Sequence, residues 1–269
     1  MTDYQSWLPD VIRIAREAGD AIMEVYRSDI AVVRKQDNSP LTHADIAAHH
    51  VIESGLQKLT PHLPQLSEES IAIPYSTRAT WRRYWLIDPL DGTREFIKRN
   101  GEFSVNIALI DHGKPIMGVV YGPDKEQLYY GCAGLGAFKQ EGDGEIQRIH
   151  ARPLNVNDLT IAGSRSHVSV KTKAFLNKVG GNLSIPKSIS LGSSLKICLV
   201  AEGLADLYPR LGLTSEWDTA AAQCVLEEAG GLLTDHQGEA FTYNTKDSLL
   251  NPEFFARGAT PHNWSQYLE

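Results

Sequence analysis

The chain has 269 residues, of which 42% are hydrophobic and 22% charged, and its formal net charge is −7 at pH 7. This composition is typical of a globular protein of one or two domains, and the acidity disfavours a binder of nucleic-acid polymers, which normally presents a basic face. Three cysteines without CxxC spacing predict reduced, buried thiols rather than a disulfide framework. No apolar run approaches ~18 residues and the N-terminus lacks a signal sequence. We therefore expect a cytoplasmic protein without a transmembrane segment, for which peripheral association with the cytoplasmic face of the inner membrane stays open.

Two helices are expected in the first quarter of the chain. Apolar residues recur at helical spacing between Leu8 and Tyr26. A second helix is expected after Thr42, because a Thr followed three residues later by Asp45 is typical of a capping box. Asp45 would lie on the inward face of the first turn, where it either caps the helix or serves a functional site. The two roles are compatible.

Paired carboxylates follow at Glu68 and Glu69. Adjacent glutamates on a surface are usually solvated. The alternative is that one of them returns to the site formed by the next motif, about twenty residues further along the chain.

Residues 85–94, WLIDPLDGTR, are the most informative stretch. Residues 85–87 read as a buried strand, and because Pro89 has no N–H we expect the strand to stop there. Asp88 and Asp91 would then lie on the turn that leaves the strand. Two carboxylates this close repel each other unless a cation lies between them, and hard oxygen ligands favour Mg²⁺, Mn²⁺ or Ca²⁺. Plain turn chemistry is the alternative, since Asp, Pro and Gly are common turn residues.

The residues after this motif predict an anion site. Gly92 permits a tight backbone path, and Thr93 opens a segment that could begin a short helix. Backbone N–H groups at such a start face anions such as phosphate. Carboxylates, N–H groups and a hydroxyl together indicate metal-assisted phosphate chemistry.

The remaining pattern divides the chain into two parts. Short alternating segments at 103–109, 116–121, 127–132 and 137–140 predict an antiparallel meander. A turn-rich stretch at 141–144 and a break at 151–153 suggest an N-terminal α+β domain at 1–152, with most metal ligands, and a C-terminal α/β domain at 153–269, with Asp218 and substrate contacts. In the second part we expect strands at 159–163, 188–191, 206–208, 232–234 and 254–256, and helices at 170–179, after 192 and from 217 to 230.

Three separated segments together carry a resemblance that none carries alone. They are Glu68-Glu69, Asp88-Pro89-Leu90-Asp91-Gly92-Thr93 and Trp217-Asp218-Thr219-Ala220-Ala221. Asp218 by itself would be explained by the helix dipole. The combination resembles the lithium-sensitive, magnesium-dependent phosphomonoesterases of the inositol monophosphatase and fructose-1,6-bisphosphatase superfamily. The fold this resemblance implies is a layered αβαβα sandwich with the metal site between its halves.

Further strings are similar to the bacterial CysQ-type branch of 3′(2′),5′-bisphosphate nucleotidases. Ser67 stands where inositol monophosphatases usually have Gly, and Arg94 is a minor departure from a familiar Lys. The matching strings lie at 96–103, 164–167, 192–196 and 207–210.

The resemblance also implies roles for individual residues. Glu68, Asp88 and the Leu90 carbonyl would hold one Mg²⁺. Asp88, Asp91 and Asp218 would hold a second, and Glu68 with waters a weaker third. Mn²⁺ would substitute, and Li⁺ and Ca²⁺ would inhibit. The implied catalytic residues are Thr93, whose hydroxyl orients the attacking water, Asp45, which supports Thr93, and Glu68. The implied substrate contacts are Glu68, Leu90, Asp91, Gly92, Thr93, Ser164, Arg165, His167, Lys196, Arg210 and Asp218.

The implied activity is hydrolysis of the 3′-phosphate of adenosine 3′,5′-bisphosphate (PAP) to AMP and phosphate, with the sulfated nucleotide PAPS as a further substrate. This reaction would clear a by-product of sulfate assimilation. The alternatives are an inositol monophosphatase and a metal-binding module without turnover. The expected partner is a small molecule, and the expected state is a monomer or weak homodimer.

Overall fold

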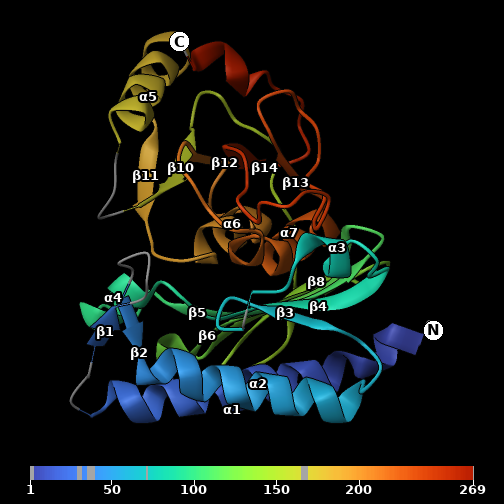
Figure 1. Cartoon of the computed structure of the whole chain (residues 1–269). Helices are drawn as coiled ribbons and strands as arrows, with labels where there is room; N and C mark the ends of the chain where they lie inside the picture. Colours follow the sequence, from blue (N-terminus) through green and yellow to red (C-terminus); the bar gives the residue numbers. More distant parts are fainter. Residues whose placement is uncertain (1–2, 29–31, 35–39, 71, 165–168, 269) are drawn as a thin grey trace.

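The computed structural model describes residues 3–28, 32–34, 40–70, 72–164 and 169–268 (Figure 1). Helices and sheets alternate in layers, so the predicted αβαβα sandwich is confirmed. The layers are, in order, the pair α1 (Leu8–Tyr26) and α2 (His43–Leu59), a seven-stranded sheet, the pair α6 (Leu195–Ala201) and α7 (Ala220–Glu228), a five-stranded sheet, and α5 (Val170–Asn182) on the outside.

The seven-stranded sheet contains the predicted meander, and its successive strands from β4 to β9 pair antiparallel. The edge strands β3 and β9 were not predicted; each is only three residues long, and β3 pairs parallel to β4 whereas β9 pairs antiparallel to β8. In spatial order the strands are β3 (Gln65–Ser67), β4 (Arg83–Asp91), β5 (Ser104–Asp111), β6 (Lys114–Gly122), β7 (Gln127–Cys132), β8 (Gly136–Glu141) and β9 (Gln147–Ile149).

Both faces of this sheet are covered, which explains the continuous apolar run in β4. Trp85 and Ile87 pack into the core under α1 and α2, whereas Tyr84 and Leu86 pack into the core shared with α6 and α7. Alternate residues of a strand point to opposite faces. Because β4 is buried on both faces, it carries only aromatic and aliphatic side chains between Arg83 at its start and Asp88.

The five-stranded sheet is mixed. Strands β11, β10 and β12 are parallel, and β14 joins β12 to β13 through antiparallel pairs. A third core, containing Phe175 and Val179 of α5, covers its outer face. Each strand lies within two residues of its predicted place: β11 (Lys187–Ser190), β10 (Thr160–Gly163), β12 (Leu207–Arg210), β14 (Phe254–Arg257) and β13 (Leu232–Thr234).

The two sheets come from stretches of chain on either side of residues 151–153. Helix α7 nevertheless packs on β6 and β7 of the other sheet. The division into domains at 152 and 153 stays a prediction.

The smaller elements are η1 (Asp3–Trp7), β1 (Val32–Arg34), β2 (Pro40–Thr42), α3 (Tyr75–Arg78), α4 (Thr93–Ile97), η2 (Pro123–Lys125), η3 (Glu216–Asp218) and η4 (Trp264–Tyr267).

The three cysteines are free and buried, as predicted. Among the described residues, no helix combines the length and the apolar character that crossing a bilayer requires.

Candidate active site

Strand β4 does not stop at Pro89, so the prediction that Asp88 and Asp91 lie on a turn beyond the strand is wrong. Asp88 pairs with Asn106 and Asp91 with Ser104, so three steps along β4 match two along β5. The extra residue forms a β-bulge. A bulge accommodates Pro89 because its residues do not all need ladder hydrogen bonds. Asp88 and Asp91 therefore both lie in the irregular C-terminal end of β4.

The turn from β4 into α4 depends on Gly92, which has a φ of 93°. A Cβ at this position would lie 3.2 Å from the Glu102 carbonyl oxygen. Glycine adopts positive φ without steric cost. The N-terminus of α4, beginning at Thr93, consequently stands directly beside Asp91.

Asp45 makes the capping bonds of α2 and also contacts Thr93. Its Oδ2 accepts bonds from the Thr42 N–H at 2.8 Å and the Thr42 hydroxyl at 2.7 Å, completing the predicted capping box of α2. Its Oδ1 accepts a bond from the Thr93 hydroxyl at 3.3 Å. The capping bonds hold the carboxylate in one orientation, which leaves Oδ1 facing Thr93.

A cluster of carboxyl groups lies at this end of the sheet, where Asp88 is buried and Glu68, Asp91 and Asp218 are partly buried. Burial raises the pKa of Asp88 well above its usual value, and the charges of Glu68 and Asp91 raise it further. Burial raises the pKa of Asp218 to about 8, again with a contribution from Asp91. Asp218 lies in the 3₁₀ turn η3 just before α7, where the Ser215 N–H donates to its Oδ2 at 2.9 Å. The ionised forms of these carboxyl groups repel one another, and a cation that lies among them relieves this repulsion.

Asp91 is held from the opposite side by the start of α6. Burial raises its pKa to about 6, although Lys196 and the Ser194 N–H act in the other direction. That N–H donates to Asp91 Oδ2 at 2.5 Å, and the Ser194 hydroxyl donates to Asn106 Oδ1 at 2.7 Å. Sequence reasoning missed Ser194 and Asn106 as site residues. The string at 192–196, quoted for its resemblance, was the available signal for Ser194.

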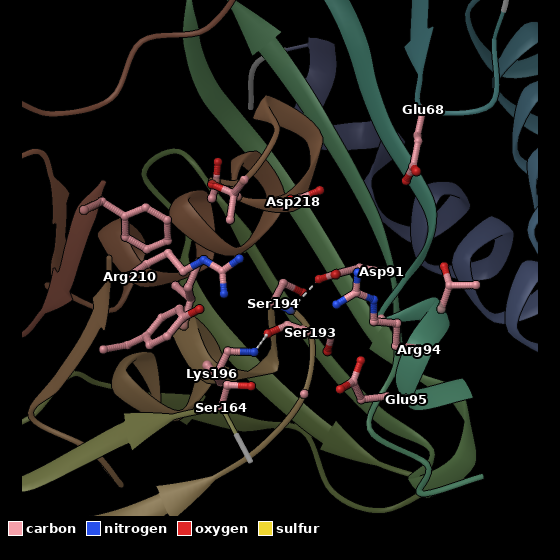
Figure 2. A pocket seen from close by; sticks show the side chains of 18 residues that line it. Glu68, Asp91, Arg94, Glu95, Ser164, Ser193, Ser194, Lys196, Arg210 and Asp218 are labelled. Atoms are coloured by element: carbon pink, nitrogen blue, oxygen red, sulfur yellow. Dashed lines mark hydrogen bonds between the residues drawn. The ribbon is translucent and has the colours of Figure 1, made fainter. Parts of the chain in front are cut away.

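Several of these groups, among them Asp91, Ser194 and Asp218, line a cavity of about 270 Å³ between the two sheets (Figure 2). Figure 2 shows Glu68, Arg94 and Glu95 on one side and Asp218, Arg210 and Lys196 on the other. Among the predicted site residues, Glu68, Asp91, Gly92, Thr93, Ser164, Lys196, Arg210 and Asp218 line it, together with Tyr208 and Ser193.

Three predicted residues, Asp45, Asp88 and Leu90, are buried and do not line the cavity. Asp88 Oδ1 accepts a bond from the Leu90 N–H at 3.0 Å within the bulge. Arg165 and His167 lie outside the described residues.

Two cations from the C-terminal half reach this cavity. Burial lowers the pKa of Lys196 to about 8, with Asp91 opposing the shift. Its ammonium group donates to the Ser193 carbonyl at 2.5 Å and lies 5.3 Å from the Tyr208 ring centroid. Arg210 donates to the Leu213 carbonyl at 2.8 Å. Its buried Nε has no hydrogen-bond partner within the part of the chain that the structure describes.

Partly buried carboxylates opposite cations in one cavity are an arrangement suited to binding anionic groups together with divalent cations. A model of the inositol monophosphatase family matches residues 3–265, and the chain belongs to this family. Members of the family are generally metal-dependent.

Several relatives are similar over nearly the whole chain. The 3′(2′),5′-bisphosphate nucleotidase CysQ of Escherichia coli K12 is 51% identical over 251 residues, covering 92% of this chain and 98% of the relative. The CysQ nucleotidase of Haemophilus influenzae is 37% identical over 270 residues, covering 100% of this chain and 99% of the relative. Among solved structures, CysQ from Bacteroides thetaiotaomicron is 38% identical with a TM-score of 0.85, covering 96% of this chain and 99% of that one. The Thermotoga maritima IMPase is 25% identical with a TM-score of 0.79, covering 99% and 97%.

Proposed function

We propose that this protein is a Mg²⁺-dependent 3′(2′),5′-bisphosphate nucleotidase that hydrolyses the 3′-phosphate of PAP to AMP and phosphate, and that also acts on PAPS. The observation that carries the proposal is the meeting of acidic residues from one half of the chain with Lys196 and Arg210 from the other in a single cavity. A bisphosphate substrate needs both features, because one phosphate reacts and the other must be held. The names of relatives up to 51% identical support the same assignment.

The donor set fits a hard divalent cation. Glu68, Asp88, Asp91 and Asp218, with the Leu90 carbonyl, would offer only oxygen atoms, which Mg²⁺ prefers. When bound, divalent cations at such a site acidify water and neutralise the charge of a phosphate group. We propose two to three Mg²⁺ ions, with Mn²⁺ able to substitute and with inhibition by Li⁺ and Ca²⁺. Rates unaffected by millimolar Li⁺ at limiting Mg²⁺ would count against this assignment.

In this proposal Thr93 and Asp45 move the proton of the attacking water. Because the Thr93 hydroxyl donates to Asp45 Oδ1, its oxygen can accept a hydrogen bond from water in the cavity. The water oxygen bonds to phosphorus while the proton of the water passes through the Thr93 hydroxyl to Asp45. The bond between phosphorus and the 3′ ester oxygen breaks, and that oxygen takes up a proton from solvent, which replaces the one that the water lost. The N–H groups of Gly92 and Thr93 would hold the phosphate oxygens. Lys196 and Arg210 would hold the second phosphate, with Ser164, Arg165 and His167 as further contacts.

The substrate class is tested by phosphate release from PAP and from inositol monophosphate, measured side by side with Mg²⁺. We expect PAP to have the much larger kcat/KM. A larger value for inositol monophosphate would make the protein an inositol monophosphatase.

Two variants of Thr93 distinguish an enzyme from a protein that only binds metal. We expect Thr93→Ala to lose turnover while its Mg²⁺ affinity stays at the wild-type level, and Thr93→Ser, which keeps the hydroxyl, to retain most of the activity. Absence of turnover in the wild type with intact metal binding would favour a non-catalytic metal-binding module.

We further propose that the protein acts on the free nucleotide in the cytoplasm, as a monomer or weak homodimer. The three buried, free cysteines support a reducing compartment.

A further inference from the structure

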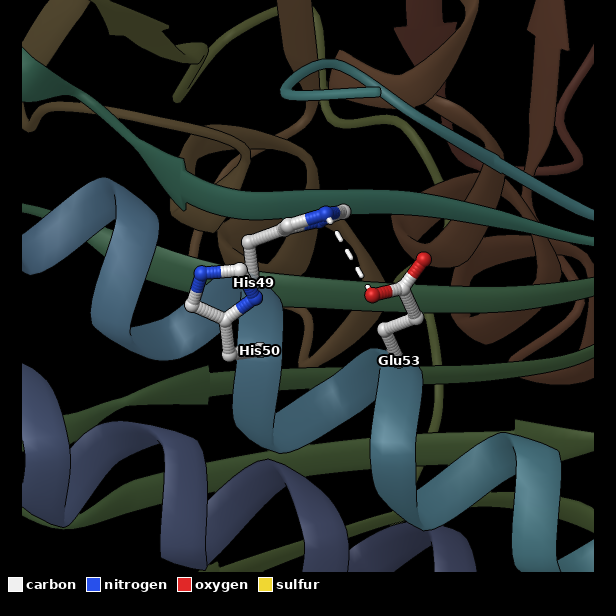
Figure 3. Close-up of side chains that lie close together, drawn as sticks. All are labelled: His49, His50 and Glu53. Carbon is white, nitrogen blue, oxygen red and sulfur yellow. Dashed lines mark ion pairs between the residues drawn. The ribbon is translucent and has the colours of Figure 1, made fainter. Parts of the chain in front are cut away.

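A second group of metal-ligating side chains lies on α2, outside the cavity. His49, His50 and Glu53 each bring one ligand atom within 4.8 Å of the others (Figure 3). His49 Nε2 lies 3.9 Å from Glu53 Oε2. None of these residues lines the cavity of the candidate active site. Two of the three ligands are imidazoles, unlike the oxygen donors of that site.

The ordinary explanation is a surface His–Glu pair one helical turn apart. The environment of His49 distinguishes this group from such a pair, because its side chain is buried and its Nδ1 lies 3.0 Å from the Ser67 hydroxyl. Metal-bound histidines almost always donate their second ring N–H to an acceptor, which sets the ring orientation, and the Ser67 hydroxyl oxygen can accept that bond from Nδ1. Figure 3 shows the other nitrogen of His49 directed at Glu53, with the His50 ring alongside.

We propose that His49, His50 and Glu53 bind one divalent transition-metal ion of the zinc class. Imidazole nitrogens select zinc, nickel and copper, whereas purely oxygen ligands suit Mg²⁺. His50 and Glu53 are exposed, so their side chains can rotate to reach bonding distance, about 2.0–2.2 Å for zinc. Buried His49 is the fixed ligand, and burial lowers the pKa of its ring, which favours the neutral form that metal binding requires.

The site lies next to a segment of the candidate active site. Ser67, which contacts His49, ends β3 and precedes Glu68, and its Cα pairs with Ile87 just before Asp88. The proposed ion would therefore fix the hydrogen bond at the end of β3. The proposal does not depend on the nucleotidase assignment, because it concerns other residues and another class of ion.

The test is the zinc stoichiometry of the full-length protein, measured by equilibrium dialysis in saturating Mg²⁺. We expect the wild type to retain one Zn²⁺ per chain. His50→Ala and Glu53→Gln should each weaken Zn²⁺ binding at least tenfold, since each removes a ligand from an exposed position without disturbing the core. Ser67→Ala should weaken it by about tenfold through loss of the orienting bond. His62→Ala removes an exposed histidine just beyond α2 and should leave binding unchanged.

A second variant identifies where the ion binds. Because zinc outcompetes Mg²⁺ for many ligands, Zn²⁺ could also enter the carboxylate cavity. Asp91→Asn should retain the Zn²⁺ if the site is on α2. Zinc binding lost in Asp91→Asn but normal in His50→Ala would overturn the proposal, as would a wild-type protein that retains no Zn²⁺.

Discussion

Burial raises the pKa of Asp91 and so disfavours its ionised form. The charge of Lys196 and the hydrogen bond from the Ser194 N–H act in the other direction. Asp91→Asn preserves the shape and removes one negative charge. We expect turnover to fall by about two orders of magnitude or more, consistent with the several kcal/mol that a catalytic metal can supply. We also expect the metal-free variant to melt no lower than the wild type, because a repelling carboxylate has become neutral.

The matched control for this variant is Asp143→Asn, the same chemical change at an exposed position. It should leave both turnover and melting temperature at wild-type values. Normal turnover in a folded Asp91→Asn protein would remove Asp91 from the set of ligands.

The raised pKa values of the cluster predict how the stability of the metal-free protein depends on pH. The pKa of Asp91 is raised to about 6 and that of Asp218 to about 8. A carboxyl group whose pKa is higher in the folded state binds more protons there, so the unfolding free energy falls as pH rises between the unfolded and folded values. This stabilisation is complete below about pH 4 and is lost as the pH rises through about 6 for Asp91 and about 8 for Asp218.

Melting temperatures measured with EDTA and with Mg²⁺ between about pH 5 and pH 8 check this expectation. The difference between the two conditions should grow with pH, because bound cations compensate the ionised carboxylates. A difference that does not vary with pH would mean that the cluster does not control stability.

At the scale of elements, the junction between β4 and α4 controls where Thr93 stands. Gly92→Ala places a Cβ on a residue with a φ of 93° and brings it 3.2 Å from the Glu102 carbonyl. We expect a loss of about 1–2 kcal/mol in the unfolding free energy. The start of α4 should also shift, so kcat should fall by more than the lost stability explains.

Chemical denaturation and steady-state kinetics test this junction. Gly134→Ala is the matched control, since Gly134 also has positive φ but an added Cβ would meet nothing within 4 Å. It should lose stability similarly and keep its kcat. Equal effects of the two substitutions on kcat would show that Gly92 matters only for folding.

At the scale of the whole molecule, the cavity lies between the two sheets. Substitutions on its two sides should therefore change different kinetic constants. Lys196 comes from α6 and would hold the phosphate that does not react. Such a contact binds ground state and transition state nearly alike, so its loss mainly raises KM. We expect Lys196→Ala to raise KM for PAP by about an order of magnitude and to leave 3′-AMP hydrolysis nearly unchanged. Arg165→Ala should behave in the same way.

Kinetics on both nucleotides decide this prediction, with Lys125→Ala as an exposed control outside the cavity. Equal losses on PAP and 3′-AMP would show that Lys196 supports Asp91 or the fold instead of the second phosphate.

The sequence by itself determined the longer helices, most of the strands and the order of these elements along the chain. The periodicity from Leu8 to Tyr26, the capping box at Thr42 and Asp45, and the alternating strands after residue 103 all predicted what the structure contains. These signals are local, because helix and strand periods and capping bonds involve residues only a few positions apart.

Only the tertiary structure decided how β4 ends and which residues meet at the site. The bulge at Pro89, the short parallel strand β3 and the bond from the Ser194 N–H to Asp91 depend on register between distant segments. The pKa values of Asp91 and Asp218 likewise depend on burial between the two sheets. No local pattern encodes these features, because each is set by the packing of segments far apart in the sequence.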